Sequence, residues 1–392
     1  MHSTASIAVV AALAGMSVAK PVEIQGKSTF RVDQVAVPKK ANLNAAQHVL
    51  KAQAKYGNLN NVDPAIKQAA AQQGSVQANN EPNDREYLCP VSIGGQTLNL
   101  DFDTGSDDLW VFSTLTPSSQ SQGHTKYNPS RAQRLNGETW SIKYQDQSGS
   151  SGIVYSDKVV VGGVTATNQA VEVATQVSQQ FQEDTDNDGL LGLSLGSNTC
   201  QPQRCTSFFD NVKSSLSQAL FATRLRRGQP GVYDFGYIDN SLYTGSISYV
   251  NTDSSYPNYW TFQAGDLSVN GNGIGSGGLA IADTGTTLML VPNDILNAYY
   301  GQIQSAQNSG GMWIFDCNDQ IPDLQVNIGG GTFTVPGSYI NWVNNGDGTC
   351  SGGLQYNQGL PFSIYGDIFL KNQYVVFDQT QGYPRLGFAQ GA

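Results

Sequence analysis

Histidine is scarce in this sequence of 392 residues. Its three histidines are His2, His48 and His124, and only His124 lies beyond residue 67. Sites of the Ser-His-Asp and Cys-His types need a histidine beside the nucleophile, and many zinc sites use several histidines. Because residues 68–392 hold only one histidine, they lack the histidines that such sites need. We therefore expect a site with no metal and no cofactor.

Long hydrophobic runs are missing after the first 20 residues, so the sequence offers no segment that could span a bilayer. The first residues read MHSTASIAVVAALAGMSVAK, with a short apolar core at 7–15 and small residues just before position 20. This pattern is typical of a secretory signal peptide. We therefore expect residues 1–19 to be a signal and the product to be secreted and extracellular.

Charged residues make up only 13% of the chain, and the net charge is −10. Residues 20–67 hold eight Lys and Arg against three Asp and Glu, a charge of +5, whereas residues 68–392 hold 13 against 28, a charge of −15. The acidic body argues against nucleic acid or a membrane as a partner. The basic segment is expected to bind the acidic body within the same chain.

Helical patterns are also few after residue 85. The best helical stretch is NLNAAQHVLKAQAKYG, with Asn42 as a cap and Gly57 as a stop, and a polar linker at 68–85 follows it. From residue 86 onward, short alternating runs separated by Gly, Asn, Asp and Ser predict β-strands. A chain of this length is sufficient for two lobes with separate cores.

The five cysteines suit one or two disulfides in an exported chain, with one thiol left over. Cys317 and Cys350 would close a long loop, and Cys200 and Cys205 a short one. Cys89 lies in the apolar run EYLCPVSIGG, which predicts a buried strand residue.

One ten-residue pattern occurs twice, as FDTGSDDLWV around Asp103 and as ADTGTTLMLV around Asp283. The two aspartates are 180 residues apart. Leu191 follows Asp103 by 88 residues and Tyr365 follows Asp283 by 82, each between an apolar residue and a glycine. Because two motifs recur in the same order at matched spacing, we interpret the chain as a duplicated β unit.

A single Asp-Thr-Gly is usually a turn, but approximate two-fold symmetry can bring two such loops together. Two carboxylates at hydrogen-bonding distance share one proton, so that one acts as an acid and the other as a base. Such a pair can deprotonate a water held between them while it protonates a peptide carbonyl oxygen. Glycines allow the loops to approach, and hydroxyls orient the carboxylates. These supporting positions are Gly105, Gly285, Thr104, Thr284, Ser106 and Thr286.

On these motifs, residues 86–392 resemble the pepsin-like aspartic endopeptidases, most closely their secreted fungal branch. The resemblance implies an all-β, bilobal fold, with two related lobes of the six-stranded type and the active cleft between them. It implies Asp103 and Asp283 as the catalytic pair, Gly285 and Thr286 near the substrate, protein and peptide substrates, and a monomer. We expect a propeptide at 20–75 and a peptidase domain at 76–392, with an N-lobe at 86–250 and a C-lobe at 251–392.

The stretch WSIKYQDQSGSSG resembles the hairpin flap of this family. Tyr144 would then cover the scissile bond, with Trp110 as its hydrogen-bond partner. Asp146 matches an acidic flap position associated with accepting lysine at the bond-cleaving subsite, although Gln145 stands where the family usually has glycine. The alternatives are an ordinary surface hairpin and a solvated turn aspartate.

Lys55-Tyr56 resembles a Lys-Tyr step of the family's activation peptide, in which the ammonium lies between the two carboxylates. The propeptide would then inhibit its own enzyme, with Lys55 as the plug. The alternative is an exposed lysine stabilised at a helix end. For the whole chain, the alternative to a peptidase is a catalytically silent binding or inhibitor protein with the same fold.

Overall fold

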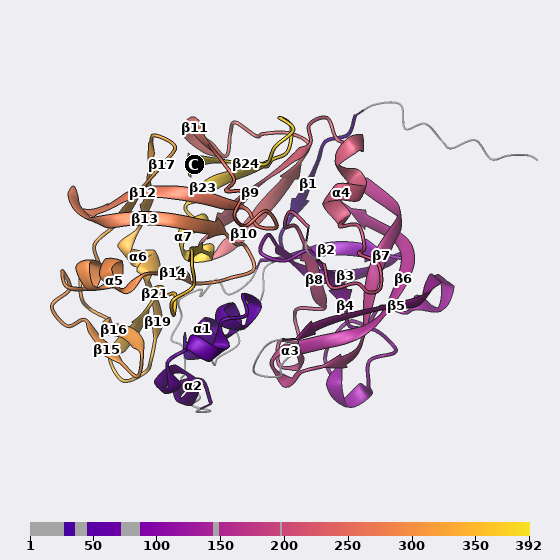
Figure 1. Cartoon of the computed structure of the whole chain (residues 1–392), viewed down its shortest axis with the longest axis horizontal. Helices are drawn as coiled ribbons and strands as arrows, with labels where there is room; N and C mark the ends of the chain where they lie inside the picture. The colour runs from indigo at the N-terminus through magenta and orange to yellow at the C-terminus, as the bar shows by residue number, and fades with distance from the viewer. Residues whose placement is uncertain (1–26, 36–44, 72–86, 144–148, 197) are drawn as a thin grey trace, which may run out of the picture.

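The computed structural model describes residues 27–35, 45–71, 87–143, 149–196 and 198–392. Strands dominate, and they form two lobes that lie side by side (Figure 1). The signal peptide, Asn42, Tyr144 and Asp146 lie outside the described residues. Within those residues no helix has the length and apolar character needed to cross a membrane.

The N-terminal lobe, on the right of Figure 1, is built on a seven-stranded sheet whose first strand also pairs with β6. The order in the sheet is β2 (Leu88–Ile93), β3 (Gln96–Asp103), β8 (Gly189–Gly192), β4 (Leu109–Val111), β7 (Val164–Val177), β6 (Gly149–Val161) and β5 (Gln133–Lys143). Its short helices are η2 (Ser118–Gln120), η3 (Pro129–Arg131), α3 (Gln179–Gln182), α4 (Phe208–Val212) and η4 (Lys213–Ser215).

The C-terminal lobe has a second seven-stranded sheet and a small four-stranded one. The large sheet has the order β18 (Gly331–Val335), β17 (Leu324–Ile328), β12 (Thr261–Val269), β13 (Asn272–Ala282), β22 (Ser363–Tyr365), β14 (Met289–Val291) and β21 (Leu354–Tyr356). The small one has the order β15 (Gln307–Ser309), β16 (Met312–Asp316), β20 (Thr349–Gly352) and β19 (Asn341–Asn344). The helices are α5 (Asn293–Tyr300), α6 (Gly337–Ile340) and α7 (Asp367–Leu370).

The predicted duplication is visible in the strand pairing. In the N-terminal lobe β3 runs parallel to β8, β8 antiparallel to β4, and β4 parallel to β7. The C-terminal lobe repeats this pattern with β13, β22, β14 and β21. The expected all-β, bilobal fold is confirmed. The main sheet of each lobe has seven strands among the described residues instead of the expected six, and short strands of three or four residues lie beside each Asp-Thr-Gly loop.

A six-stranded sheet joins the lobes. Its order is β1 (Phe30–Asp33), β10 (Gln229–Phe235), β9 (Leu220–Arg226), β23 (Gln373–Asp378), β24 (Arg385–Gly391) and β11 (Tyr243–Asn251). The basic N-terminal segment supplies the edge strand β1, and the Phe30 ring stacks on Phe235 with centroids 4.7 Å apart. The expected lobe boundary at residue 250 falls within β11, and the domain limits stay a prediction.

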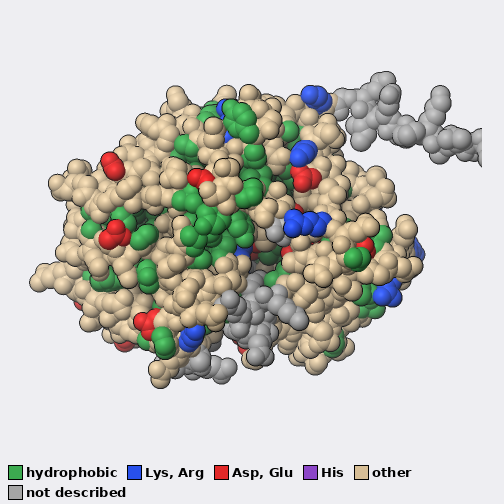
Figure 2. Space-filling view, in the orientation of Figure 1, with side chains coloured by type: hydrophobic (Ala, Val, Ile, Leu, Met, Phe, Trp, Pro, Cys, Tyr) green, Lys and Arg blue, Asp and Glu red, His purple; other side chains and the backbone are tan. Residues whose placement is uncertain are grey.

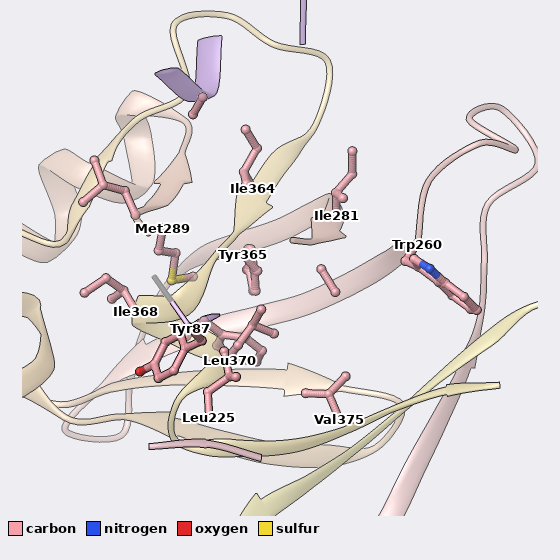
Figure 3. Close-up of a cluster of buried hydrophobic side chains, with 14 of the residues drawn as sticks. Tyr87, Leu225, Trp260, Ile281, Met289, Ile364, Tyr365, Ile368, Leu370 and Val375 are labelled. Atoms are coloured by element: carbon pink, nitrogen blue, oxygen red, sulfur yellow. The ribbon is translucent and has the colours of Figure 1, made fainter. Parts of the chain in front are cut away.

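The core of the C-terminal lobe gathers aromatic and branched side chains from its seven-stranded sheet and from the six-stranded sheet that joins the lobes (Figure 3). Trp260, Ile281, Tyr365 and Leu370 are all fully buried. The Trp260 indole donates a hydrogen bond of 2.8 Å to the carbonyl oxygen of Leu193 in the N-terminal lobe. Because a buried indole N–H needs an acceptor, this bond ties the C-terminal core to the other lobe.

Helices α1 (Ala45–Lys55) and α2 (Pro64–Ala71), with η1 (Leu59–Asn61) between them, lie between the lobes in Figure 1. The predicted helix is confirmed for the part that is described, and Gly57 follows its end with φ +67°. Gly57 donates a backbone hydrogen bond of 3.0 Å to Ala54, as expected for a glycine that stops a helix.

Both suggested disulfides are present, Cys200–Cys205 and Cys317–Cys350. Cys89 keeps a free thiol and is fully buried in β2, as predicted. On the face shown in Figure 2, lysines and arginines are few and scattered among uncharged side chains.

Candidate active site

The two Asp-Thr-Gly loops meet where the lobes join. Asp103 is the last residue of β3, and Asp283 directly follows the last residue of β13. Their exposed fractions are 2% and 0%. Each strand is parallel to a neighbour at this point, Asp103 opposite Gly192 and Ala282 opposite Tyr365, so equivalent sheet positions deliver the two carboxylates to one place.

The two threonines cross-link the loops reciprocally. The Thr104 amide donates to the Thr284 hydroxyl at 3.1 Å, and the Thr284 amide donates to the Thr104 hydroxyl at 3.0 Å. The Thr104 hydroxyl donates onward to the Ala282 carbonyl at 2.9 Å, and that of Thr284 to the Phe102 carbonyl at 2.5 Å. Buried amides are satisfied in this way across the lobe boundary, so the loops are fixed relative to each other.

Each carboxylate receives the same pair of hydrogen bonds. The Gly105 amide donates to Asp103 Oδ1 at 2.8 Å, and the Gly285 amide donates to Asp283 Oδ1 at 3.0 Å. The hydroxyls of Ser106 and Thr286 donate to the respective Oδ2 atoms, both at 2.5 Å. These donors orient both carboxylates and favour their ionised forms.

Neither glycine leaves room for a side chain. A Cβ on Gly105 would lie 2.5 Å from Asp283 Oδ1, and one on Gly285 would lie 2.3 Å from Asp103 Oδ1. Real Cβ contacts essentially never come under 3.0 Å. The glycines therefore allow the two carboxyl groups to approach each other, as the sequence predicted.

Lys55, at the end of α1, lies between the carboxylates. Its Nζ is 2.6 Å from Asp103 Oδ1 and 2.8 Å from Asp283 Oδ1, and its side chain is 11% exposed. The Tyr56 hydroxyl donates to Asp283 Oδ2 at 2.7 Å. The alternative of an exposed lysine at a helix end is therefore wrong, because the chain turns both side chains into the space between the lobes.

The electrostatics of the group follow from burial and from this cation. Burial raises the pKa of Asp103, an effect that the Lys55 ammonium opposes and the Asp283 carboxylate supports. Burial also acts to raise the pKa of Asp283, but the ammonium and hydrogen bonds from Lys55 and Thr286 outweigh it and lower that pKa. Burial acts to lower the pKa of Lys55, and the two carboxylates reverse this and raise it. Lys55 therefore stays protonated between the two carboxyl groups.

Two sets of contacts made by the N-terminal segment were not predicted. The ring of Tyr56 packs edge-on against Tyr259 and Phe362, with centroids 5.5 and 5.4 Å apart. Arg31 in β1 contacts Asp234 at 2.7 Å and Asp239 at 2.6 Å. The sequence indicated only a general attraction between a basic segment and an acidic body, because the contacting residues are about 200 positions apart.

Of the predicted flap, the structure describes the flanking strands β5 and β6. Tyr144 and Asp146 lie outside the described residues, so their roles stay predictions. Trp110 is buried in β4, where it stacks on Trp140 with centroids 5.9 Å apart and meets Phe181 edge-on at 5.2 Å. Its bond to Tyr144 likewise stays a prediction.

Among the described residues, one group has the spacing of metal ligands, Glu172 with Cys200 and Cys205. Its two sulfurs are joined in a disulfide and cannot act as thiolate ligands. This group therefore offers only one ligand atom to a metal.

The family model of the eukaryotic aspartyl proteases matches residues 86–391. The chain belongs to this family. Aspergillopepsin-1 of Aspergillus pseudoglaucus is 50% identical over 396 aligned residues, which cover 100% of each protein. Penicillopepsin-1 of Penicillium janthinellum is 57% identical over 323 residues, or 80% of this chain and 98% of that protein.

Among solved structures, an aspartic proteinase from Irpex lacteus matches this aspartyl protease with a TM-score of 0.64 and 26% identity, covering 79% of this chain and 95% of that one. The predicted resemblance to fungal pepsin-like enzymes is confirmed, and the chain is an aspartic endopeptidase.

Proposed function

We propose that the chain is the precursor of a secreted acid endopeptidase and that Asp103 and Asp283 are its catalytic pair. The observation that carries this proposal is the position of Lys55 Nζ, within 2.8 Å of one oxygen of each aspartate. A site that holds one ammonium between two carboxylates can hold a water molecule in the same place once the ammonium leaves. The reaction needs such a water between an acid and a base.

In the proposed reaction the ionised carboxylate takes a proton from this water. The oxygen of the water attacks the carbonyl carbon of the peptide bond at the same time. The other carboxyl group, which holds the shared proton, donates it to the carbonyl oxygen. The resulting tetrahedral diol collapses when a proton moves to the amide nitrogen and the C–N bond breaks. Ser106 and Thr286 keep the outer carboxylate oxygens in place throughout, since each donates to its aspartate.

We propose that the segment around Lys55 and Tyr56 is an inhibitory propeptide that acid releases. Two further contacts support this proposal: β1 occupies an edge of the sheet that joins the lobes, and Arg31 forms ion pairs with Asp234 and Asp239 there. Protonation of Asp103 and Asp283 in acid removes the partners of Lys55, so the segment loses this electrostatic attachment. Removal of the signal at 1–19 and cleavage near 68–85 would give a monomeric extracellular enzyme.

For specificity we propose that Tyr144 covers the scissile bond and that Asp146 accepts lysine at the bond-cleaving subsite, beside broad acceptance of large apolar residues. A carboxylate at an otherwise apolar pocket can pair with an incoming ammonium. A peptide-library profile tests this proposal: wild-type enzyme should cleave after lysine, and Asp146→Ala should lose this cleavage but keep cleavage after apolar residues. A profile without lysine that Asp146→Ala leaves unchanged would contradict it.

The test of the function is digestion of denatured haemoglobin at about pH 3–4 by the acid-treated protein. We expect digestion only after the N-terminal segment of the precursor has been cleaved off. Digestion should stop when a pepstatin-type transition-state mimic is added. A silent binding protein with this fold would bind the mimic or a peptide without producing fragments. Asp210→Asn is the control variant, because Asp210 lies on α4 and pairs with Lys213 away from the site.

A further inference from the structure

Trp260 contacts both loops that carry the aspartates. It directly precedes β12 and is fully buried. Its carbonyl oxygen accepts a 3.0 Å hydrogen bond from the amide of Ala282, the residue before Asp283. Its indole N–H donates at 2.8 Å to the carbonyl oxygen of Leu193, and the Leu193 amide donates at 2.8 Å to the carbonyl oxygen of Asp103. A continuous path of hydrogen bonds therefore leads from the Asp283 loop through Trp260 to Asp103.

The segment after β8 is bonded to the Asp103 loop at two points. Leu193 donates to the aspartate itself, and the amide of the next residue, Ser194, donates at 2.9 Å to the carbonyl oxygen of Ser106. The Ser106 hydroxyl in turn donates to the Asp103 carboxylate. A shift of the Leu193 carbonyl group therefore moves both the backbone of Asp103 and the hydroxyl that orients its carboxylate.

The indole is held in its position by aromatic packing. Trp260 lies edge-on against Phe377 and Phe221, with ring centroids 5.2 and 6.0 Å away, and these two rings stack on each other at 4.6 Å. Both phenylalanines are fully buried in strands of the sheet that joins the lobes, β23 and β9. Figure 3 shows the indole at the edge of the buried cluster. Because closely packed rings have little freedom to turn, the indole N–H stays directed at the Leu193 carbonyl.

The duplication places a different residue at the equivalent position of the N-terminal lobe. Trp260 precedes β12, which pairs with β13, the strand that leads to Asp283. Tyr87 precedes β2, which pairs with β3, the strand that ends at Asp103. The Tyr87 hydroxyl has one proton to donate and gives it to the carbonyl oxygen of Arg226 in β9, at 3.1 Å. The bond from this position to the opposite lobe's loop is thus a property of Trp260 and not of the repeated unit.

We propose that Trp260 is a positioning residue for catalysis, whose indole N–H sets the place of Asp103 relative to Asp283. The reciprocal bonds of Thr104 and Thr284 join the two loops just after the aspartates, whereas Trp260 joins them where the strands end. The inference deepens the proposed function, since it rests on taking the two aspartates as the catalytic pair. Without the indole N–H the base of the Asp103 loop is no longer fixed, and the two carboxyl groups move apart.

The test compares Trp260→Phe with the wild type after acid activation of the full chain, with active sites counted by titration with the transition-state mimic. The value of kcat per active site should fall about 10-fold to 10²-fold, because a displacement of about 1 Å from the reacting geometry has an effect of this size. KM should stay unchanged, since the indole is fully buried and the variant loses an interaction that acts only on the reacting groups.

The pH range of activity should also narrow in Trp260→Phe. The two carboxyl groups lose their protons in separate steps because they interact with each other. A larger separation between them weakens this interaction and brings the two steps together, so the bell-shaped pH profile of kcat/KM becomes narrower. A variant that is only less stable keeps the width of the profile.

Trp313→Phe is the matched control. Trp313 lies in β16 and stacks on Tyr300 with centroids 4.7 Å apart, and its buried indole nitrogen has no hydrogen-bond partner among the described residues. This change therefore shrinks a packed indole without removing a hydrogen bond, and it should keep the kcat and the pH profile of the wild type. A reduced kcat with a narrower profile in Trp260→Phe alone supports the proposal. Wild-type kcat in Trp260→Phe, an unchanged profile width, or an equal loss in Trp313→Phe overturns it.

A second replacement decides the case in which Trp260→Phe does not fold. Benzothienylalanine at position 260 has sulfur in place of the indole N–H and keeps the shape of the ring, so the packing is retained. It should show the same loss of kcat, and wild-type kcat would overturn the proposal. Asp103→Asn, measured alongside, separates this inference from the proposed function. An active Asp103→Asn contradicts the catalytic pair, whereas an inactive one beside a Trp260→Phe with wild-type kcat contradicts only the role of Trp260.

Discussion

Replacement of Lys55 by alanine should release the inhibitory segment at a higher pH than in the wild-type precursor. The substitution removes the cation that contacts Asp103 and Asp283 at 2.6 and 2.8 Å and leaves two buried carboxylates facing each other. Removing one partner of a buried ion pair usually costs about 3–5 kcal/mol. This cost corresponds to a weakening of the segment's attachment by about 10²-fold to 10³-fold or more.

The sign of the pH effect follows from the carboxylates. The pKa of Asp283 is lowered in the folded precursor, so the stability from its pairing with Lys55 is complete above the ordinary value of about 4 and is lost as the pH falls through the lowered value. In Lys55→Ala a shared proton replaces the ammonium in acid. The difference between variant and wild type should therefore be largest near neutral pH and small in strong acid.

The assay is a pH series in which purified precursor is incubated and the appearance of a shorter chain and of peptidase activity is followed. Lys55→Ala should shorten at neutral pH, where the wild type stays intact. Lys67→Ala makes the same charge change at an exposed position of α2 in the same segment and should behave as wild type. Tyr56→Phe loses one hydrogen bond to a carboxylate, about 1.5–3 kcal/mol, and should be intermediate. If Lys55→Ala and Lys67→Ala activate at the same pH, Lys55 is not the plug.

Three further predictions concern the site and its attachment. Gly285→Ala should lower kcat about 10²-fold, because its Cβ would lie 2.3 Å from an Asp103 oxygen, whereas Gly273→Ala, which meets nothing within 4 Å, should leave kcat unchanged. Thr284→Val should lower the unfolding free energy by about 1–3 kcal/mol in urea titrations, because the Thr104 amide loses its acceptor; an unchanged value would contradict the cross-link. Arg31→Ala should lower the melting temperature of the precursor, since it leaves Asp234 without its cation; an unchanged melting temperature would contradict its role in attachment.

Much of the site could be predicted because its signals are local and repeated. Two Asp-Thr-Gly motifs at matched spacing indicated a duplicated fold whose loops meet, and the structure brings Asp103, Asp283 and the predicted Lys55 within hydrogen-bonding distance. The supporting glycines and hydroxyls follow from the same motifs, because each donor is within three residues of its aspartate.

The contacts that the sequence did not reveal join residues far apart in the chain. Arg31 and Asp234 are 203 positions apart, and they meet because β1 pairs with β10. An acidic residue in an alternating strand pattern resembles any solvated side chain until the neighbouring strand is known. Composition therefore indicated the attraction between the two parts of the chain but not the residues that produce it.

The claim that the two aspartates act as one acid–base unit is tested most directly by kcat for Asp103→Asn, Asp283→Asn and the double variant, each freed of its N-terminal segment by an added protease. Residues that act as a unit are strongly non-additive, so each single variant should lose about as much activity as the double variant. Asp210→Asn, treated in the same way, should keep wild-type activity. A single variant that retains substantial peptidase activity, or losses that simply multiply in the double variant, would contradict the account.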